Sequence, residues 1–130
     1  MGADNLSIAF ATDVRLWLTS VSSALTTDDN LIFCRMQLLN NEQMVTALKQ
    51  LHGWHLHEGA LSKDFVFKNF SEAFAFMTRV ALIAERLDHH PDWNNTYNRV
   101  HITLMTHDKG GLTKKDTEFA AAIETILEPA

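Results

Sequence analysis

The chain has 130 residues, 46% of them hydrophobic, and a formal net charge of −5, which suits one domain with a modest core. No basic stripe is visible, which disfavours direct nucleic-acid binding, and no apolar run approaches the roughly 20 residues that span a bilayer. Cys34 is the single cysteine, and Asp4 and Asp13 lie where a signal or transit peptide would be basic, so we expect a cytoplasmic protein in a reducing compartment.

Residues 1–38 are predicted to form a mostly helical N-terminal extension, and residues 39–130 the organised domain. Apolar residues recur at three- and four-residue steps in the extension, which is typical of an amphipathic helix: Leu6, Phe10, Val14, Trp17, Val21 and Leu25. The turn-forming residues 26–30 should end this helix before the short apolar run 31–34. We expect the helix to pack on the domain or on a neighbouring subunit, and nothing in it indicates chemistry.

A helix and a β-hairpin are predicted next. Asn40 and Gln43 have the spacing of a capping box, and apolar residues continue at helical spacing until Gly53. Residues 54–57 alternate like a strand, residues 58–60 form a turn, and residues 61–68 form a second strand. His55 and His57 share one strand face, and we interpret them as exposed strand residues, not as a metal-binding pair.

A long helix follows, for which Ser71 is the expected N-cap. Its expected buried stripe contains mainly aromatic and small residues: Ala73, Phe76, Met77, Val80, Ala84 and Leu87. Pro91 disfavours helical geometry at the residue before it, so the helix should end near Asp88 or His89 and His90 should be extended. The side chains of the two adjacent histidines should therefore point apart.

A second strand pair and a last helix complete the pattern. Residues 93–97 lead into a clear strand, residues 99–105, with Val100, Ile102 and Leu104 facing the core. Residues 106–108 end that strand, residues 109–111 form a turn, and Thr113 with Asp116 should begin the last helix. The order α-β-β-α-β-β-α with short connections predicts an α+β fold, a four-stranded antiparallel sheet with helices packed on one face.

The candidate site combines the helix end with the later strand end. Glu85 lies four residues before His89, so both should share one helix face, where the carboxylate could support the imidazole. His107 could face the two adjacent histidines across a cleft, and Trp93 could offer a flat surface to a planar ring. Thr106 and Asp108 offer polar atoms to orient such a ring. Histidine is the side chain best suited to proton transfer near neutral pH.

Three interpretations fit this histidine cluster. The first is acid–base catalysis on a small polar heterocycle. The second is a metal site with His89, His107 and Glu85 as ligands, although the spacing does not match a paired-histidine helical zinc motif. The third is a histidine-rich turn that only caps a helix. Residue spacing alone does not decide between them and does not name a substrate.

Residues 74–116 closely resemble the pterin-4a-carbinolamine dehydratases, and the likeness extends more loosely from Leu39 to Leu127. The Glu-x3-His-His-Pro pattern together with the later Thr-His pair is the most specific part of it. The matching residues are Phe76 to Leu82, Glu85, Leu87 to Pro91, Trp93, Tyr97, Asn98, Val100 to Leu104, Thr106, His107, Gly111 and Leu112.

This resemblance implies dehydration of 4a-hydroxytetrahydrobiopterin to quinonoid dihydrobiopterin, a lyase reaction that recycles the pterin of aromatic amino acid hydroxylases. It implies no metal or redox cofactor, a pterin substrate, and a homodimer or homotetramer built by strand-edge pairing and helix packing. His89 and His107 would act as general acids from opposite faces of the pterin, His90 would hold the substrate, and Glu85 would support them. The expected pterin contacts are Asp88, His89, His90, Pro91, Trp93, Met105, Thr106, His107 and Asp108.

The sequence departs from the family pattern at a few positions. Asp92 and Asp108 replace glutamates, Asn94 replaces an aromatic residue, and Met105 replaces a small polar residue. The alternative function is a non-catalytic binding module, because vertebrate family members act as transcriptional coactivators through a helical surface. Such a module would use exposed apolar positions of the helix 71–87, whereas the intact histidine set favours the enzyme.

Overall fold

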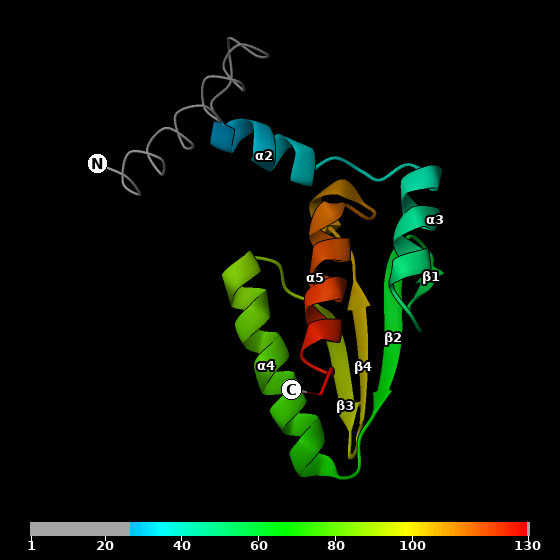
Figure 1. Cartoon of the computed structure of the whole chain (residues 1–130), viewed down its shortest axis with the longest axis vertical. Helices are drawn as coiled ribbons and strands as arrows, with labels where there is room; N and C mark the ends of the chain where they lie inside the picture. The colour runs from blue at the N-terminus through cyan, green and yellow to red at the C-terminus, as the bar shows by residue number, and fades with distance from the viewer. Residues whose placement is uncertain (1–26, 130) are drawn as a thin grey trace, which may run out of the picture. The chain divides into compact units, whose positions relative to one another are not determined.

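The computed structural model describes residues 27–129, and the chain divides into two units, Met1–Arg35 and Met36–Ala130. In the first unit, helix α2 spans Thr27–Arg35 (Figure 1). The prediction that residues 26–30 form a turn is therefore wrong for residues 27–30. Threonine and aspartate are tolerated at a helix start, where acidic groups meet the positive end of the helix dipole. The predicted helical stripe between residues 6 and 25 lies outside the described residues.

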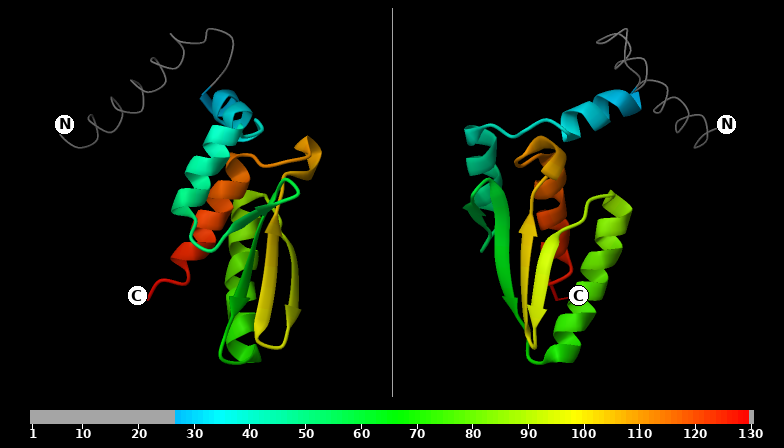
Figure 2. Two further views of the ribbon diagram at one scale, coloured as in Figure 1. Left: turned by 90° about the vertical axis from the view of Figure 1, so that its right-hand side faces the viewer. Right: turned by 180° about the vertical axis from the view of Figure 1, so that it is seen from behind.

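The second unit is the predicted α+β fold. Its elements are α3 (Asn41–Gln50), β1 (His55–His57), β2 (Ala60–Val66), α4 (Phe70–Leu87), β3 (Asp92–Thr96), β4 (Arg99–Leu104), the 3-10 turn η1 (His107–Lys109) and α5 (Lys114–Thr125). The strands form one antiparallel sheet in the order β1-β2-β4-β3. Helices α3, α4 and α5 lie on one face of that sheet, as the side view in Figure 2 shows, and no helix of the second unit's described residues covers the other face.

Tight turns and local caps explain most element boundaries. Glu58 and Gly59 both have positive φ, 50° and 78°, so the β1–β2 hairpin closes with a two-residue turn of the primed type. The predicted capping boxes of α3 and α5 are both present. The predicted cap of α4 at Ser71 is wrong, because Asn69 caps the helix by accepting a hydrogen bond from Glu72 N at 2.9 Å.

The core lies between the sheet and the three helices. Val100, Ile102 and Leu104 are fully buried, as predicted for the central strand β4. Helix α4 buries Ala73, Phe76, Val80 and Ala84 of the predicted stripe and also Ile83, whereas Met77 and Leu87 are only partly buried. Helix α5 contributes Phe119. None of the helices within residues 27–129 is long and apolar enough to cross a membrane.

Candidate active site

Helix α4 ends in a way that separates the two adjacent histidines. Asp88 adopts the left-handed conformation with φ 47°, and the N–H groups of Asp88 and His89 donate to the carbonyls of Glu85 and Ala84. These two bonds form a Schellman motif, which stops the helix before Pro91. His89 and His90 therefore leave the helix in different directions, as the sequence predicted.

The left-handed residue also changes the partner of Glu85. The prediction that Glu85 would support His89 from the same helix face is wrong, because residue 89 no longer follows the helical path. Glu85 Oε1 instead lies 2.6 Å from His90 Nε2, in a pair whose side chains are 76% and 60% exposed. A carboxylate only accepts hydrogen bonds, so Nε2 of His90 carries the proton.

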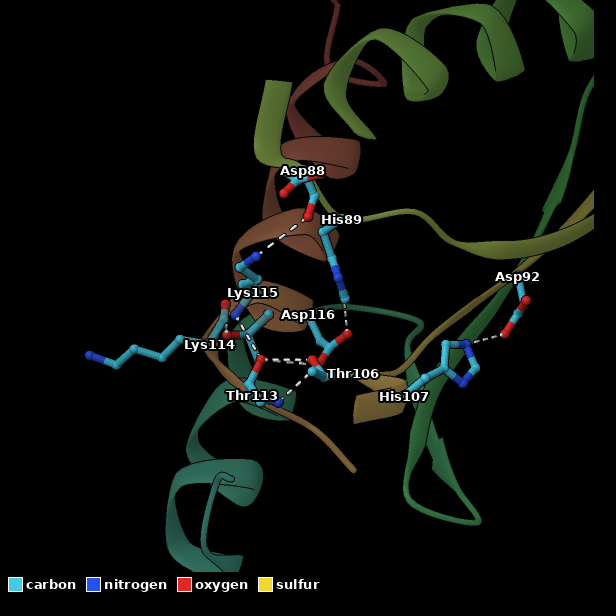
Figure 3. A network of polar contacts seen from close by, with 10 residues as sticks. Asp88, His89, Asp92, Thr106, His107, Thr113, Lys114, Lys115 and Asp116 are labelled. Carbon is cyan, nitrogen blue, oxygen red and sulfur yellow. Dashed lines mark hydrogen bonds and ion pairs between the residues drawn. The ribbon is translucent and has the colours of Figure 1, made fainter. Parts of the chain in front are cut away.

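His89 is held by a buried carboxylate from α5. Its Nε2 lies 2.6 Å from Asp116 Oδ1, and the side chains of His89 and Asp116 are 10% and 0% exposed. Nε2–H must donate to this carboxylate, which leaves Nδ1 as the other ring nitrogen. Figure 3 shows the ring of His89 directed from the end of α4 onto this aspartate.

Asp116 is fully satisfied by a buried polar network. Its Oδ2 accepts from Thr113 N at 2.8 Å and from Thr106 Oγ1 at 2.8 Å. Since the single hydroxyl proton of Thr106 is used there, the Thr113 hydroxyl donates to Thr106 Oγ1 across 2.8 Å. A buried carboxylate with this many donors is a rigid support, because each donor would be left unpaired if the side chain moved.

His107 is held from the sheet. It begins η1 directly after Thr106, and its Nε2 lies 2.9 Å from Asp92 Oδ2, at the start of β3. Asp92 follows His90 by two residues. Both side chains of this pair are largely exposed, 61% for His107 and 68% for Asp92.

Two bridges therefore join the helix end to the strand end, as Figure 3 shows. One runs from His89 through Asp116 to Thr106, and the other from His107 to Asp92. Each of the three histidines has its own carboxylate partner at Nε2. These contacts bring together segments 85–92, 106–107 and 113–116, and each of the three rings meets a different carboxylate.

The other candidate residues surround these bridges to different degrees. The Asp88 carbonyl accepts from Lys115 Nζ at 3.4 Å, Asp108 is exposed in η1, and Pro91 and Met105 are partly buried. Trp93 packs against the core opposite Ile102, so only the part of its ring that the core leaves uncovered could meet a ligand.

The described part of the chain offers no set of side chains that would support the metal interpretation. Within residues 27–129, no cluster of three or more histidine, cysteine, aspartate or glutamate side chains has an arrangement that could hold a metal ion. Glu85, His89 and His107 are each engaged with a different partner.

Two carboxylates were missed by the sequence reasoning as site residues. Asp116 was identified only as part of a capping box, and Asp92 only as a departure from the family pattern. Each lies far in sequence from the histidine it holds, 27 residues for Asp116 and 15 for Asp92. The one signal in the sequence was the acidic third position of a capping box, which does not reveal a second partner.

Comparisons with known proteins agree on one family. The family model described as "Pterin 4 alpha carbinolamine dehydratase" matches residues 37–126. A protein of Rhizorhabdus wittichii that bears the provisional name pterin-4-alpha-carbinolamine dehydratase is 52% identical over 92 residues, covering 69% of this chain and 95% of its own length. A relative of the same provisional name from Rhodopseudomonas palustris is 51% identical over 90 residues, covering 68% of this chain and 89% of its own length.

Solved structures show the same fold. The transcriptional coactivator/pterin dehydratase of Brucella melitensis superposes with a TM-score of 0.69 at 44% identity, over 71% of this chain and all of its own. A pterin dehydratase-like protein identified as a RuBisCO assembly factor in the alpha-carboxysome shares 24% identity with a TM-score of 0.50, over 59% of this chain and 89% of its own. The second likeness concerns the fold alone.

Proposed function

Because this chain belongs to the pterin 4 alpha carbinolamine dehydratase family, we propose that it dehydrates 4a-hydroxytetrahydrobiopterin to quinonoid dihydrobiopterin by histidine acid–base catalysis. The observation that carries the proposal is the set of three histidine–carboxylate pairs where the end of α4 meets the end of β4. This set lies within the matched residues and matches the chemistry that the reaction needs.

The reaction is a proton-transfer problem. The bond between ring carbon 4a and the hydroxyl oxygen breaks, and the oxygen leaves as water after taking a proton. A double bond forms from carbon 4a to the neighbouring ring nitrogen, and a ring nitrogen gives up a proton. The conversion changes no overall redox state and consumes no net proton, so a donor and an acceptor in fixed positions suffice.

The three histidines have different tasks in this proposal. His89 and His107 lie on opposite faces of the pterin, and each protonates a 4a-hydroxyl on its own face through Nδ1 of the doubly protonated ring, because Nε2–H is bound to a carboxylate; the ring is left neutral and can take up the proton that the pterin nitrogen releases. His90, with Glu85 behind it, holds the substrate.

The remaining candidates line the site. We propose that Asp88, Pro91, the uncovered edge of Trp93 and the segment 105–108 contact the pterin. Apart from His107, none of these residues takes part in proton transfer. Asp88 and Asp108 are exposed and could reach the polar edge of a heterocycle, whereas Thr106 acts through its buried bond to Asp116.

The test is a dehydration assay on synthetic 4a-carbinolamine. Replacing one proton-transfer histidine should lower turnover by about 10²- to 10⁴-fold while the domain stays folded. We expect this for His89→Ala and His107→Ala, with His55→Ala and His57→Ala as controls, since those two histidines are exposed on β1. Full activity of both site variants would reject the roles, and an inactive wild-type chain would reject the dehydratase function.

The proposal also includes a homo-oligomer. It includes a role in the same pathway as aromatic amino acid hydroxylases, whose pterin the reaction would recycle. An oligomer is supported by the outer edge of β3, which pairs with no other strand among residues 27–129, and by large apolar side chains that α4 leaves exposed: Phe70 49%, Phe74 56% and Leu82 67%. Light scattering of the purified chain at several concentrations tests it, and a monomer at all of them would reject it. A role as binding module alone is not favoured, because it would leave the three histidine–carboxylate pairs without a use.

A further inference from the structure

Packing alone restrains the ring of His107 only weakly. The side chain is 61% exposed and stands on the first residue of a three-residue 3-10 turn that ends at Gly110. An exposed side chain can populate several rotamers, and fixing one of them costs conformational entropy. The orientation of this ring therefore depends on a specific partner.

That partner is well placed and is itself held by the sheet. Asp92 is the first residue of β3, and its Cα pairs in register with Thr103 on β4, four residues before His107. The bond from His107 Nε2 to Asp92 Oδ2 measures 2.9 Å. At the His107 end of this bond, the preceding residue Thr106 is buried and bonded to Asp116. The backbone on both sides of the bond is thus fixed by paired or buried neighbours.

We propose that Asp92 is a positioning residue that sets the tautomer and orientation of His107, a role that rests on the proposed dehydratase function. The carboxylate accepts Nε2–H, which assigns the proton to that nitrogen and directs Nδ1 toward the substrate. Asp92 itself does not touch the reacting atoms. The departure from glutamate at this position shortens the arm by one methylene and keeps the acceptor.

A neighbouring pair provides a matched control. Asp64 on β2 holds His101 on β4 in the same manner, with Oδ1 2.8 Å from Nδ1 and with a carboxylate that is 79% exposed. It joins the same two side-chain types, its carboxylate is exposed like that of Asp92, and it lies on the same sheet, but its histidine lies outside the candidate site. Removing either aspartate should cost little stability, because solvent screens exposed ion pairs.

The experiment compares Asp92→Ala, Asp64→Ala and Asp92→Glu in the full chain, with kcat and KM measured on 4a-carbinolamine. Asp92→Ala should lower kcat about 10-fold with little change in KM, within the ceiling of about 10²- to 10⁴-fold that loss of a whole proton-transfer group allows. Asp92→Glu should restore most of the activity, and Asp64→Ala should leave it unchanged.

Two further measurements separate positioning from a general structural effect. In a His107→Ala background, adding Asp92→Ala should cause no further loss, because the aspartate would act only through that ring. Nitrogen-15 NMR of the His107 ring should show one tautomer, protonated at Nε2, in the wild type and a mixture in Asp92→Ala.

The outcomes are distinguishable. Unchanged kcat in Asp92→Ala with an active wild type would overturn the positioning role alone, as would an equal loss in both backgrounds. An inactive wild-type chain would overturn the dehydratase function and this role together.

Discussion

Replacing Asp116 with asparagine tests the buried bridge most sharply, because it changes one oxygen to an NH2 group and leaves the volume unchanged. Two donors, Thr113 N and the Thr106 hydroxyl, converge on Oδ2, whereas one donor, His89 Nε2–H, meets Oδ1. The asparagine should keep its single oxygen toward the two donors. Its NH2 group would then face the ring of His89 and force Nε2 to become an acceptor.

The consequence for the ring is a change of tautomer. The proton of His89 moves to Nδ1, and a second proton at Nε2 is opposed by the NH2 group that faces it. In the proposed mechanism the wild-type ring donates from Nδ1 as an imidazolium and is left neutral, whereas the variant ring, already neutral, could donate from Nδ1 only by becoming an anion. Turnover should fall by about 10²- to 10⁴-fold, the contribution of one proton-transfer group. Substituting the supporting aspartate of a serine protease triad by asparagine lowers activity for the same reason.

The stability cost should be smaller than the effect on activity. Weakening one buried charge-assisted hydrogen bond costs about 1–3 kcal/mol, against a typical total stability of about 5–15 kcal/mol. The assays are urea unfolding, the dehydration rate, and NMR of the His89 ring. Asn40→Ala is the control, because it removes the exposed capping box of α3 at a cost of about 1 kcal/mol without approaching the site. An Asp116→Asn protein with full activity and an unchanged tautomer would refute the reasoning.

Three further predictions concern backbone strain and a remote ion pair, and each is measured by urea unfolding. Asp88→Gly should stabilise the fold by about 1 kcal/mol, because glycine adopts the left-handed conformation without strain, and a decrease would contradict that account. The same variant should bind pterin more weakly if Asp88 contacts it, as calorimetry with a pterin product can show. Glu58→Asn should stabilise the β1–β2 hairpin by about 0.4–1 kcal/mol, since Asn-Gly is favoured in a turn with two positive φ values; an unchanged midpoint would contradict it. Glu124→Ala should destabilise the fold by about 1–3 kcal/mol, because Trp54 Nε1 and Lys63 Nζ both bond Glu124 Oε1, at 2.8 and 2.7 Å, and activity should be retained.

The sequence predicted those features of the fold that local chemistry determines. The alternation of β4, the two capping boxes and the end of α4 before Pro91 all follow from interactions within a few residues. The same reasoning failed at the start of α4, where Asn69 and Ser71 are both good caps and only the path of the preceding strand selects between them. The turn predicted for residues 27–30 was wrong for a related reason, because residue types that favour turns also favour the first positions of a helix.

The site was predictable in its histidines and not in their partners. His89 and His90 were recognised because they precede Pro91, and His107 because it fits the same family pattern. The carboxylates of His89 and His107 come from other elements, so their proximity depends on how α5 packs against α4 and how β3 pairs with β4. The predicted pairing of Glu85 with His89 assumed an unbroken helix. One residue in the left-handed conformation at Asp88 was enough to redirect the carboxylate to His90.

The three histidine–carboxylate pairs differ most in burial, and burial decides how much the loss of each pair should affect stability and chemistry. The His89–Asp116 pair is almost completely buried, so its geometry is set before any ligand binds and its loss affects both stability and chemistry. The pairs of His90 and His107 are more than half exposed, so water competes with their carboxylates until a flat ligand covers them. In the proposed reaction, His89 is therefore the fixed reference against which the pterin is placed. The two exposed rings are the ones whose hydrogen bonds should shorten and strengthen as the substrate excludes water.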